Sequence, residues 1–147
     1  MQKREQAVAT DTAPPAGTVL LVEDNAEVAE VGRAYFEQLG YQVRHASSAQ
    51  AALDLIKRED EIDLVFSDIL MPGGMNGLEL ADAVHRRFPQ MAVLLTTGYS
   101  SSAQDAVRRG FEVLQKPYDL ATLERASREA RGAGGEAAPL APQQAAG

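Results

Sequence analysis

The chain has 147 residues, of which 45% are hydrophobic and 24% charged, and it contains no cysteine. That is enough for one domain with a buried core, and the missing cysteine excludes disulfides and thiolate metal sites. The longest apolar runs are too short to cross a bilayer and the N-terminus lacks the apolar core of a secretion signal, so we expect a cytoplasmic protein without membrane insertion.

The net charge of −7 lies in the middle of the chain, because acidic and basic residues cancel in both terminal segments. No basic stripe is available to neutralise phosphates, which argues against direct binding to nucleic acid. An acidic domain of this kind is compatible with divalent cations and with basic partners.

Both ends of the chain are rich in small residues and proline. Residues 1–17 and 131–147 hold four of the seven prolines and show no periodic apolar pattern. We interpret them as disordered tails, so that residues 18–130 form the folded domain.

The first predicted elements are a buried strand and an amphipathic helix. The strand covers residues 18–22, and Asn25 is placed to cap the helix that follows. Gly40 ends this helix. Its apolar positions are expected on one face and are Val28, Val31, Tyr35 and Leu39.

Strands and helices alternate along the rest of the folded segment. Further strands are predicted at 41–45, 62–67, 91–96 and 112–115. The helices between and after them are expected after Ser47 or Ser48, at 78–88, at 104–109, and from Leu120, which Asp119 caps. Five apolar strands alternating with helices predict an α/β, doubly wound parallel sheet that is covered on both faces. The pattern alone does not choose among small doubly wound domains.

Polar residues that could bind a ligand or take part in a reaction follow the predicted strands. In open parallel sheets, ligands gather at the carboxyl ends of the strands. The residues at those ends are Glu23 and Asp24, then Asp68, then Thr96 and Thr97, and finally Lys116 and Pro117. Clustered carboxylates raise one another's pKa, and a hard divalent cation such as Mg²⁺ relieves their repulsion. A metal beside a carboxylate and an amine suits the handling of a phosphoryl group.

Four fragments at these strand ends resemble the receiver domains of response regulators in two-component signalling. The fragments are Glu23-Asp24, Asp68-Ile-Leu-Met-Pro72, Thr97-Gly98 and Lys116-Pro117-Tyr118. Each alone is weak, but four in the right order make a strong pattern. The resemblance covers residues 18 to about 130 and implies a flavodoxin-like five-stranded sheet of order 2-1-3-4-5.

The resemblance also implies a function. A receiver takes a phosphoryl group from the phosphohistidine of a sensor histidine kinase or a histidine phosphotransfer protein, and then changes its contacts with a downstream protein, here unknown. It is a phosphorelay switch that acts on its own aspartate, and not an enzyme.

The resemblance assigns roles to individual residues. Asp68 is the phosphoacceptor, and it shares Mg²⁺ with Asp24, with Glu23 through water, and with the backbone carbonyl of Leu70. Lys116 pairs with Asp68 and then with the phosphate. Thr97 moves its hydroxyl onto the phosphate, and it is preferred to Thr96 because the small Gly98 follows it. Pro117 is expected to follow a cis bond.

Plainer interpretations exist for each of these residues. A lone aspartate after a strand is often a turn residue, and acids at a helix start favour the helix dipole. The threonines could be ordinary strand residues, and the lysine a surface charge. His45 and His85 have no neighbours at ligand spacing and are not expected to bind metal.

Three features depart from the receiver pattern. The loop Gly73-Gly74-Met75-Asn76-Gly77 is one residue longer than the common spacing and resembles receivers of, or associated with, hybrid sensor histidine kinases; its two glycines can absorb the extra residue. The stretch from Thr97 to Lys116 is short, which predicts a short fourth helix. Val113 stands where most receivers carry an aromatic residue, and neither Tyr99 nor Phe111 is in register to replace it.

Other classes of protein fit the sequence less well. An aspartyl-nucleophile phosphatase usually has Asp-x-Asp after its first strand, which Glu23-Asp24-Asn25 does not supply. A flavin- or nucleotide-binding domain needs a phosphate loop where this chain has two acids. A degenerate receiver that acts only as a binding module remains an alternative, although the intact Asp68, Asp24 and Lys116 argue against it.

Overall fold

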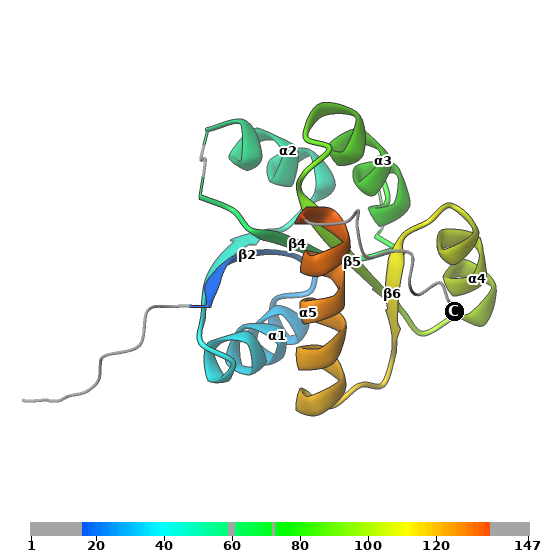
Figure 1. Cartoon of the computed structure of the whole chain (residues 1–147). Coiled ribbons are helices and arrows are strands. Elements are labelled where there is room, and N and C mark those ends of the chain that lie inside the picture. Colours follow the sequence, from blue (N-terminus) through cyan, green and yellow to red (C-terminus); the bar gives the residue numbers. More distant parts are fainter. Residues whose placement is uncertain (1–15, 59–60, 72, 136–147) are drawn as a thin grey trace, which may run out of the picture.

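A computed structural model of the chain describes residues 16–58, 61–71 and 73–135, in which strands and helices alternate (Figure 1). In chain order the elements are β2 (Gly17–Val22), α1 (Ala26–Gln38), β3 (Tyr41–Ala46), α2 (Ala49–Arg58), β4 (Leu64–Asp68), α3 (Gly77–Arg87), β5 (Ala92–Thr97), α4 (Ser100–Arg108), β6 (Glu112–Gln115) and α5 (Leu120–Gly135). No helix in this part of the chain is long and apolar enough to cross a membrane.

The strands form one five-stranded sheet in the order β3-β2-β4-β5-β6, and every neighbouring pair is parallel. This is the predicted order 2-1-3-4-5. Helices α1 and α5 cover one face of the sheet, and α2, α3 and α4 lie on the other (Figure 1). The carboxyl ends of all five strands therefore meet at one edge.

Each face of the sheet has its own hydrophobic core. Because successive side chains of a strand point to opposite faces, the buried residues of each strand divide between the two cores. The core under α1 and α5 includes Leu64, Phe66 and Leu94, whereas the core under α2, α3 and α4 includes Val65 and Leu95. A strand covered on both faces reads as a continuous apolar run, which is why these strands could be found from the sequence.

The buried face of α1 differs from the one predicted. Val28 and Val31 are 43% and 55% exposed, and the residues against the sheet are Ala29, Gly32 and Phe36. A side chain at position 32 would begin 3.3 Å from Leu21 Cδ2, so the small residues let α1 lie close to β2. The prediction was wrong at the two valines because apolar periodicity does not register burial by small residues.

Helix α4 begins at Ser100, four residues before the predicted start at Gln104. Polar residues fill the first turns of this helix, and only Ala106 is buried. The helix therefore has no apolar periodicity by which the sequence would reveal its start. With nine residues α4 is still the shortest of the five helices in the described chain, as expected from the short stretch between Thr97 and Lys116.

Side-chain caps begin several helices. The predicted caps Asn25 and Asp119 accept hydrogen bonds from Val28 N at 3.0 Å and Thr122 N at 2.9 Å. Ser48, one of two candidates, accepts from Ala51 N at 3.1 Å.

The folded segment extends slightly beyond the boundaries placed on the sequence. Strand β2 starts at Gly17, and α5 continues past Ala130 to Gly135. Arg131 ties the two ends together, because its Nη1 donates to Ala16 O at 2.7 Å and to Tyr41 Oη at 3.2 Å. The remaining tail residues, 1–15 and 136–147, lie outside the described residues.

Candidate functional site

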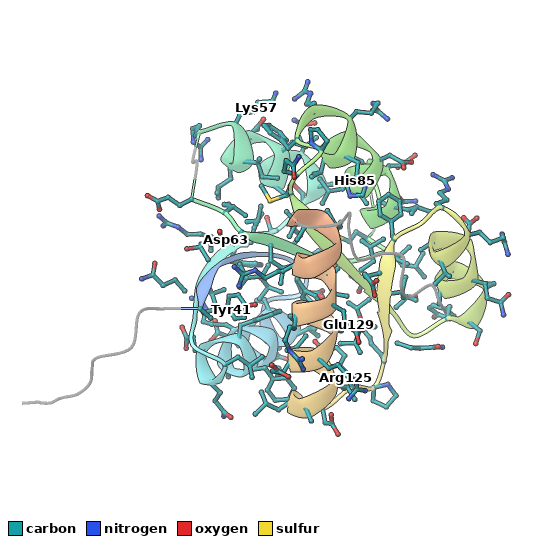
Figure 2. The ribbon with its side chains drawn as sticks, viewed as in Figure 1. Tyr41, Lys57, Asp63, His85, Arg125 and Glu129 are labelled. Carbon is teal, nitrogen blue, oxygen red and sulfur yellow. The ribbon has the colours of Figure 1, made fainter. Side chains whose placement is uncertain are left out.

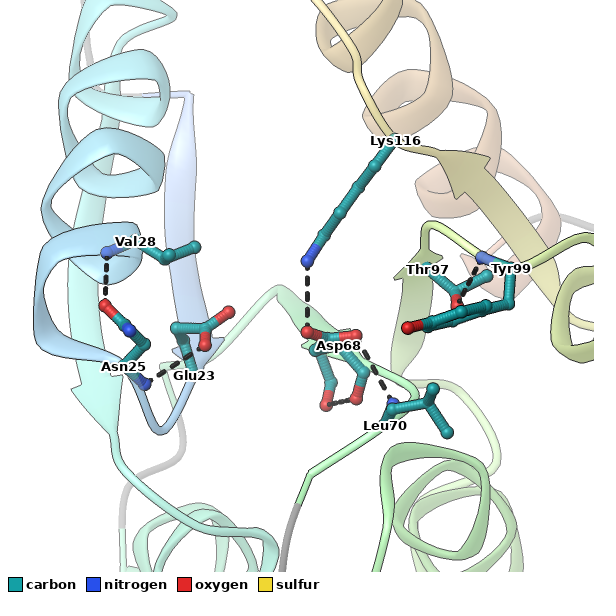
Figure 3. Close-up of polar contacts among 9 residues, drawn as sticks. Glu23, Asn25, Val28, Asp68, Leu70, Thr97, Tyr99 and Lys116 are labelled. Atoms are coloured by element: carbon teal, nitrogen blue, oxygen red, sulfur yellow. Dashed lines mark hydrogen bonds and ion pairs between the residues drawn. The ribbon is translucent and has the colours of Figure 1, made fainter.

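Asp68 ends the central strand β4, between the ends of β2 and β5. Its side chain is 14% exposed, and both of its carboxylate oxygens have partners. Oδ2 lies 3.1 Å from Lys116 Nζ, and Oδ1 accepts a hydrogen bond from the backbone N–H of Leu70 at 3.3 Å (Figure 3). The carboxylate is thus fixed in orientation and still open to solvent on part of its surface.

Lys116 comes from the far side of the sheet, directly after β6. Its backbone N–H donates to Thr97 O at 2.9 Å, which continues the β5–β6 ladder to the edge of the sheet. The Lys116–Pro117 bond is cis, as expected. The lysine side chain is 34% exposed and reaches across to Asp68, so this ion pair brings together residues that are 48 apart in the chain.

Backbone hydrogen bonds hold the loop that follows Asp68. Ile69 N donates to Thr96 O at 2.9 Å, and Gly77 N donates to Ile69 O at 2.8 Å. A Cβ on Gly77 would overlap the Asp68 carbonyl and lie 2.8 Å from Ile69 Cα, so only glycine fits where α3 meets the acceptor strand. Gly73 and Gly74 have positive φ angles of 69° and 80°, which explains how they absorb the extra loop residue. Pro72 lies outside the described residues.

Two more carboxylates follow β2. Glu23 is 7% exposed, and its Oε2 accepts a hydrogen bond from Asn25 N at 3.1 Å. Burial raises the pKa of Glu23, and the nearby Asp68 and Asp24 raise it further, against the opposing effects of the Asn25 N–H and Lys116. Asp24 is exposed. Glu23 thus lies in the same region as Asp24 and Asp68.

The donor set at this edge fits a hard cation. Lys116 pairs with Asp68 and also acts on Glu23, and Asp24 adds a third carboxylate near Glu23, so negative charge is in excess in this region. Carboxylate oxygens are ligands that Mg²⁺ takes. Within the described ranges, no three histidine, aspartate or glutamate side chains stand close enough to form a metal site by themselves. A backbone carbonyl and waters would have to complete the coordination, which agrees with the preference of Mg²⁺ for keeping waters.

The two threonines at the end of β5 point to opposite faces of the sheet. Thr97 has the same parity as Val93 and Leu95 and lies on the α4 side, where its Oγ1 accepts from Tyr99 N at 3.2 Å. Thr96 lies on the α5 side, and its buried hydroxyl has no hydrogen-bond partner in the described structure. Both are almost fully buried, so burial does not distinguish them. The choice of Thr97 over Thr96 stays a prediction.

The α4 side of β6 carries no ring near the site. Val113 pairs with Leu95 and packs, half-buried, against the core under α2, α3 and α4. Phe111 lies at the opposite end of the strand, with its ring centroid 4.9 Å from that of His85, and Tyr99 is 62% exposed. Neither aromatic residue replaces the one that the receiver pattern expects.

Sequence reasoning missed several contributors to the site. The His45 ring nitrogen Nε2 lies 2.8 Å from Glu23 O. This residue is exposed on the edge strand β3, as a surface or edge residue is expected to be, and it also contacts the turn after β2. Asn76 and Glu79 form a capping box at the start of α3, with bonds of 2.8 and 2.9 Å. The Asn-x-x-Glu spacing could have revealed this box, whereas no local signal marks His45.

Known proteins resemble this chain over the same segment. The model of the response regulator receiver domain matches residues 19–128. The phosphoglycerate transport system transcriptional regulatory protein PgtA of Salmonella typhimurium is 35% identical over 121 residues, which are 78% of this chain and 29% of PgtA. The sensor kinase CckA of Brucella abortus is 35% identical over 122 residues, 78% of this chain and 12% of CckA. The chain thus spans less than a third of the length of these relatives.

Solved structures agree with this match. A response regulator receiver domain protein from Clostridium thermocellum has a TM-score of 0.73 and 27% identity, with 79% of this chain and 94% of that chain covered. The response regulator TrrA of Thermotoga maritima, solved in complex with Mg²⁺ and BeF, has a TM-score of 0.71 and 25% identity, with 78% and 98% covered. The chain therefore belongs to the family of response-regulator receiver domains.

Proposed function

We propose that this receiver domain accepts a phosphoryl group on Asp68 in the presence of Mg²⁺ and thereby changes its contacts with other proteins. The observation that carries the proposal is the Asp68 carboxylate itself. It is held by Lys116 Nζ and Leu70 N–H, it lies at the edge where five strands end, and it keeps 14% of its surface exposed.

The chemistry follows from these contacts. A carboxylate oxygen of Asp68 attacks phosphorus, an O–P bond forms, and the P–N bond of a donor phosphohistidine breaks with its electron pair left on the imidazole. Lys116 then pairs with a phosphoryl oxygen instead of Asp68 Oδ2. Positioning and charge neutralisation supply most of the catalysis in reactions of this kind. Because the product is the modified domain itself, we do not class the chain as an enzyme.

Asp24, Asp68 and the carbonyl of Leu70 are the proposed ligands of Mg²⁺, and Glu23 acts through a bound water. When bound, the cation neutralises charge on the phosphoryl oxygens. Burial is the main cause of the raised pKa of Glu23, and the charges of Asp68 and Asp24 add to it. A bound cation would offset that repulsion. Thr97 is proposed to turn its hydroxyl from Tyr99 N toward the phosphate.

The proposed donor is a sensor histidine kinase or a histidine phosphotransfer protein. Two of the relatives support this choice, because CckA of Brucella abortus is a sensor kinase and ArcB of Escherichia coli is an aerobic respiration control sensor protein. The downstream partner is proposed to be a protein, because a chain with a net charge of −7 is poorly suited to neutralise the phosphates of nucleic acid.

Acetyl phosphate with Mg²⁺ tests the proposal without a partner. We expect an acid-stable, base-labile phosphoprotein that forms in the wild type and is lost in Asp68→Asn. The matched control is Asp54→Asn, because Asp54 is an exposed aspartate on α2 that bonds only to Gln50 among its described contacts. Incorporation that persists in Asp68→Asn contradicts the proposal, and absence of incorporation in the wild type favours a receiver that acts only by binding.

A further inference from the structure

Phosphorylation of a receiver has to change a distant surface, and the face under α4 lacks the ring that usually does this. Val113 occupies the position of that ring, and Phe111 lies at the far end of β6. The opposite face of the sheet, under α1 and α5, holds an unbroken series of aromatic contacts instead.

Four rings make up this series, which we name the aromatic column: Tyr118, Phe66, Phe36 and Tyr41. The ring centroids of Tyr118 and Phe66 are 6.0 Å apart, those of Phe66 and Phe36 are 5.2 Å apart, and those of Phe36 and Tyr41 are 5.5 Å apart. Interplanar angles of 89°, 71° and 89° make each contact edge-to-face, the arrangement that ring quadrupoles favour.

One end of the column is part of the site. Tyr118 stands two residues after Lys116, and Phe66 two residues before Asp68. The first ring contact of the column is therefore made by near neighbours in sequence of the two residues in the central ion pair. Burial and the neighbouring Glu23, Tyr35 and Asp68 raise the pKa of Tyr118 to about 12, which reflects a phenol placed against the acidic site.

The other end of the column is the contact among Ala16, Tyr41 and Arg131, near the two ends of the described fold, which we name the junction. Tyr41 begins β3 and pairs with Gly17, the first residue of β2, and Figure 2 shows it at this edge of the molecule. The guanidinium of Arg131 lies 5.6 Å from the centroid of the Tyr41 ring and also donates to Tyr41 Oη and to Ala16 O. Tyr41 thus contacts residues near both ends of the described fold, through Gly17 and Arg131.

The column is packed tightly enough to transmit a displacement. Phe36 is completely buried, Phe66 is 3% exposed and Tyr41 is 9% exposed. Interiors of this density are poorly compressible, so a ring that moves at one contact must be accommodated at the next. Tyr35 touches Tyr118 from the side at 6.1 Å and forms a branch toward the surface of α1.

We propose that the aromatic column couples loading of Asp68 to the Arg131–Tyr41–Ala16 contact, so that phosphorylation changes this junction. When Lys116 moves from Asp68 to a phosphoryl oxygen, Tyr118 shifts against Phe66, and the shift passes through Phe36 to Tyr41. This inference rests on the proposed function, because it needs Asp68 to be loaded. It links the site to the contact between residues near the two ends of the described fold.

Fluorine NMR of the full chain labelled with 3-fluorotyrosine tests the coupling. The four tyrosines report from different places: Tyr118 at the site, Tyr35 beside it, Tyr99 next to Thr97, and Tyr41 at the junction. Loading uses Mg²⁺ and beryllofluoride, and single tyrosine-to-phenylalanine variants assign the signals. We expect the signals of Tyr118 and Tyr41 both to move on loading in the wild type.

Two variants interrupt the column at its centre. In Phe36→Leu, and in Phe36→Met with its more adaptable side chain, the Tyr41 movement should be lost while the Tyr99 and Tyr118 signals still respond. The matched control is Phe111→Leu, which removes a buried ring from the other core and should leave the Tyr41 movement unchanged.

Each outcome separates the two proposals. If Tyr99 and Tyr118 respond but wild-type Tyr41 does not, or if Tyr41 still moves in both Phe36 variants, the column is contradicted and the proposed function stands. If no tyrosine signal responds to Mg²⁺ and beryllofluoride, the proposed function itself fails.

Discussion

At the scale of single residues, the site depends on contacts that fix one carboxylate. Lys116 and the Leu70 N–H each hold one oxygen of Asp68, and Gly77 lets the start of α3 lie directly against the Asp68 carbonyl. The first of these contacts follows from a recognisable motif. The last does not, because the steric need for glycine at position 77 exists only once α3 is folded back onto β4.

Replacing Gly77 by alanine tests this close approach. The new Cβ would overlap backbone atoms of Asp68 and Ile69, which cannot move without shifting β4. We expect Gly77→Ala to lower the free energy of unfolding by roughly 3 kcal/mol, the upper end of the usual cost of overpacking. Urea unfolding followed by circular dichroism measures the change.

The control for Gly77→Ala is the same substitution in a helix with free space. Gly132 in α5 has nothing within 4 Å of an added Cβ, so Gly132→Ala should raise stability by up to about 1 kcal/mol. Similar effects for the two substitutions would show that the contact between Gly77 and β4 is not close.

Glu112 gives stability a predictable dependence on pH. Burial raises its pKa in the folded state, and the nearby Glu129 raises it further. A carboxyl with a raised folded pKa favours folding below its unfolded pKa, and this contribution is lost as the pH rises through the folded value. Glu112→Gln should therefore increase the free energy of unfolding at pH 7, and the gain should shrink as the pH falls toward 4.

Urea unfolding of the wild type and Glu112→Gln at both pH values measures this effect. Glu61→Gln, at an exposed position, serves as the control for loss of one negative charge. An equal gain from both variants at pH 7 would assign the effect to net charge and not to the burial of Glu112.

At the scale of elements, the helices show what a pattern of residues can and cannot predict. The strands were found because a covered parallel sheet demands continuous apolar runs, and the caps were found because Asn25 and Asp119 are specific helix starters. The buried face of α1 was missed because Ala29 and Gly32 pack by being small. The start of α4 was missed because its first turns are polar.

The capping box of α3 is expected to support the site as well as the helix. Asn76 Oδ1 accepts from Glu79 N at 2.8 Å, directly after the loop that follows Asp68. Asn76→Ala should cost about 1 kcal/mol of stability, as caps generally do, and should also weaken beryllofluoride binding because the loop loses its anchor. Chemical denaturation and a fluorescence or NMR titration measure the two effects.

A cap remote from the site separates these two consequences. Ser48 accepts from Ala51 N at the start of α2, so Ser48→Ala should cost a similar amount of stability and leave beryllofluoride binding unchanged. If Asn76→Ala binds beryllofluoride as tightly as Ser48→Ala does, the α3 start does not support the site.

At the scale of the whole molecule, the order of the sheet followed from the resemblance to receivers and was confirmed by the structure. The place of the site followed from the same resemblance and stays a prediction. The aromatic column could not be predicted in the same way. Its four rings come from four separate segments, and neighbours across a sheet carry no spacing signal in a single sequence.

The column gives the departure at Val113 a physical interpretation. A domain without a ring under α4 still has a series of aromatic contacts that begins at the site. It runs through the core under α1 and α5 to the contact between Tyr41 and Arg131. On this face of the sheet, we expect loading to alter the contact in which Arg131 binds Tyr41 and Ala16.

The identity of the phosphoacceptor is the central claim, and chemical trapping measures it directly. Borohydride reduces an aspartyl phosphate to homoserine, so the chain is phosphorylated with acetyl phosphate and Mg²⁺, reduced, digested and mapped by mass spectrometry. The account predicts homoserine at position 68 alone. Homoserine at position 24, or the equivalent reduction product at Glu23, with Asp68 unchanged, would contradict it.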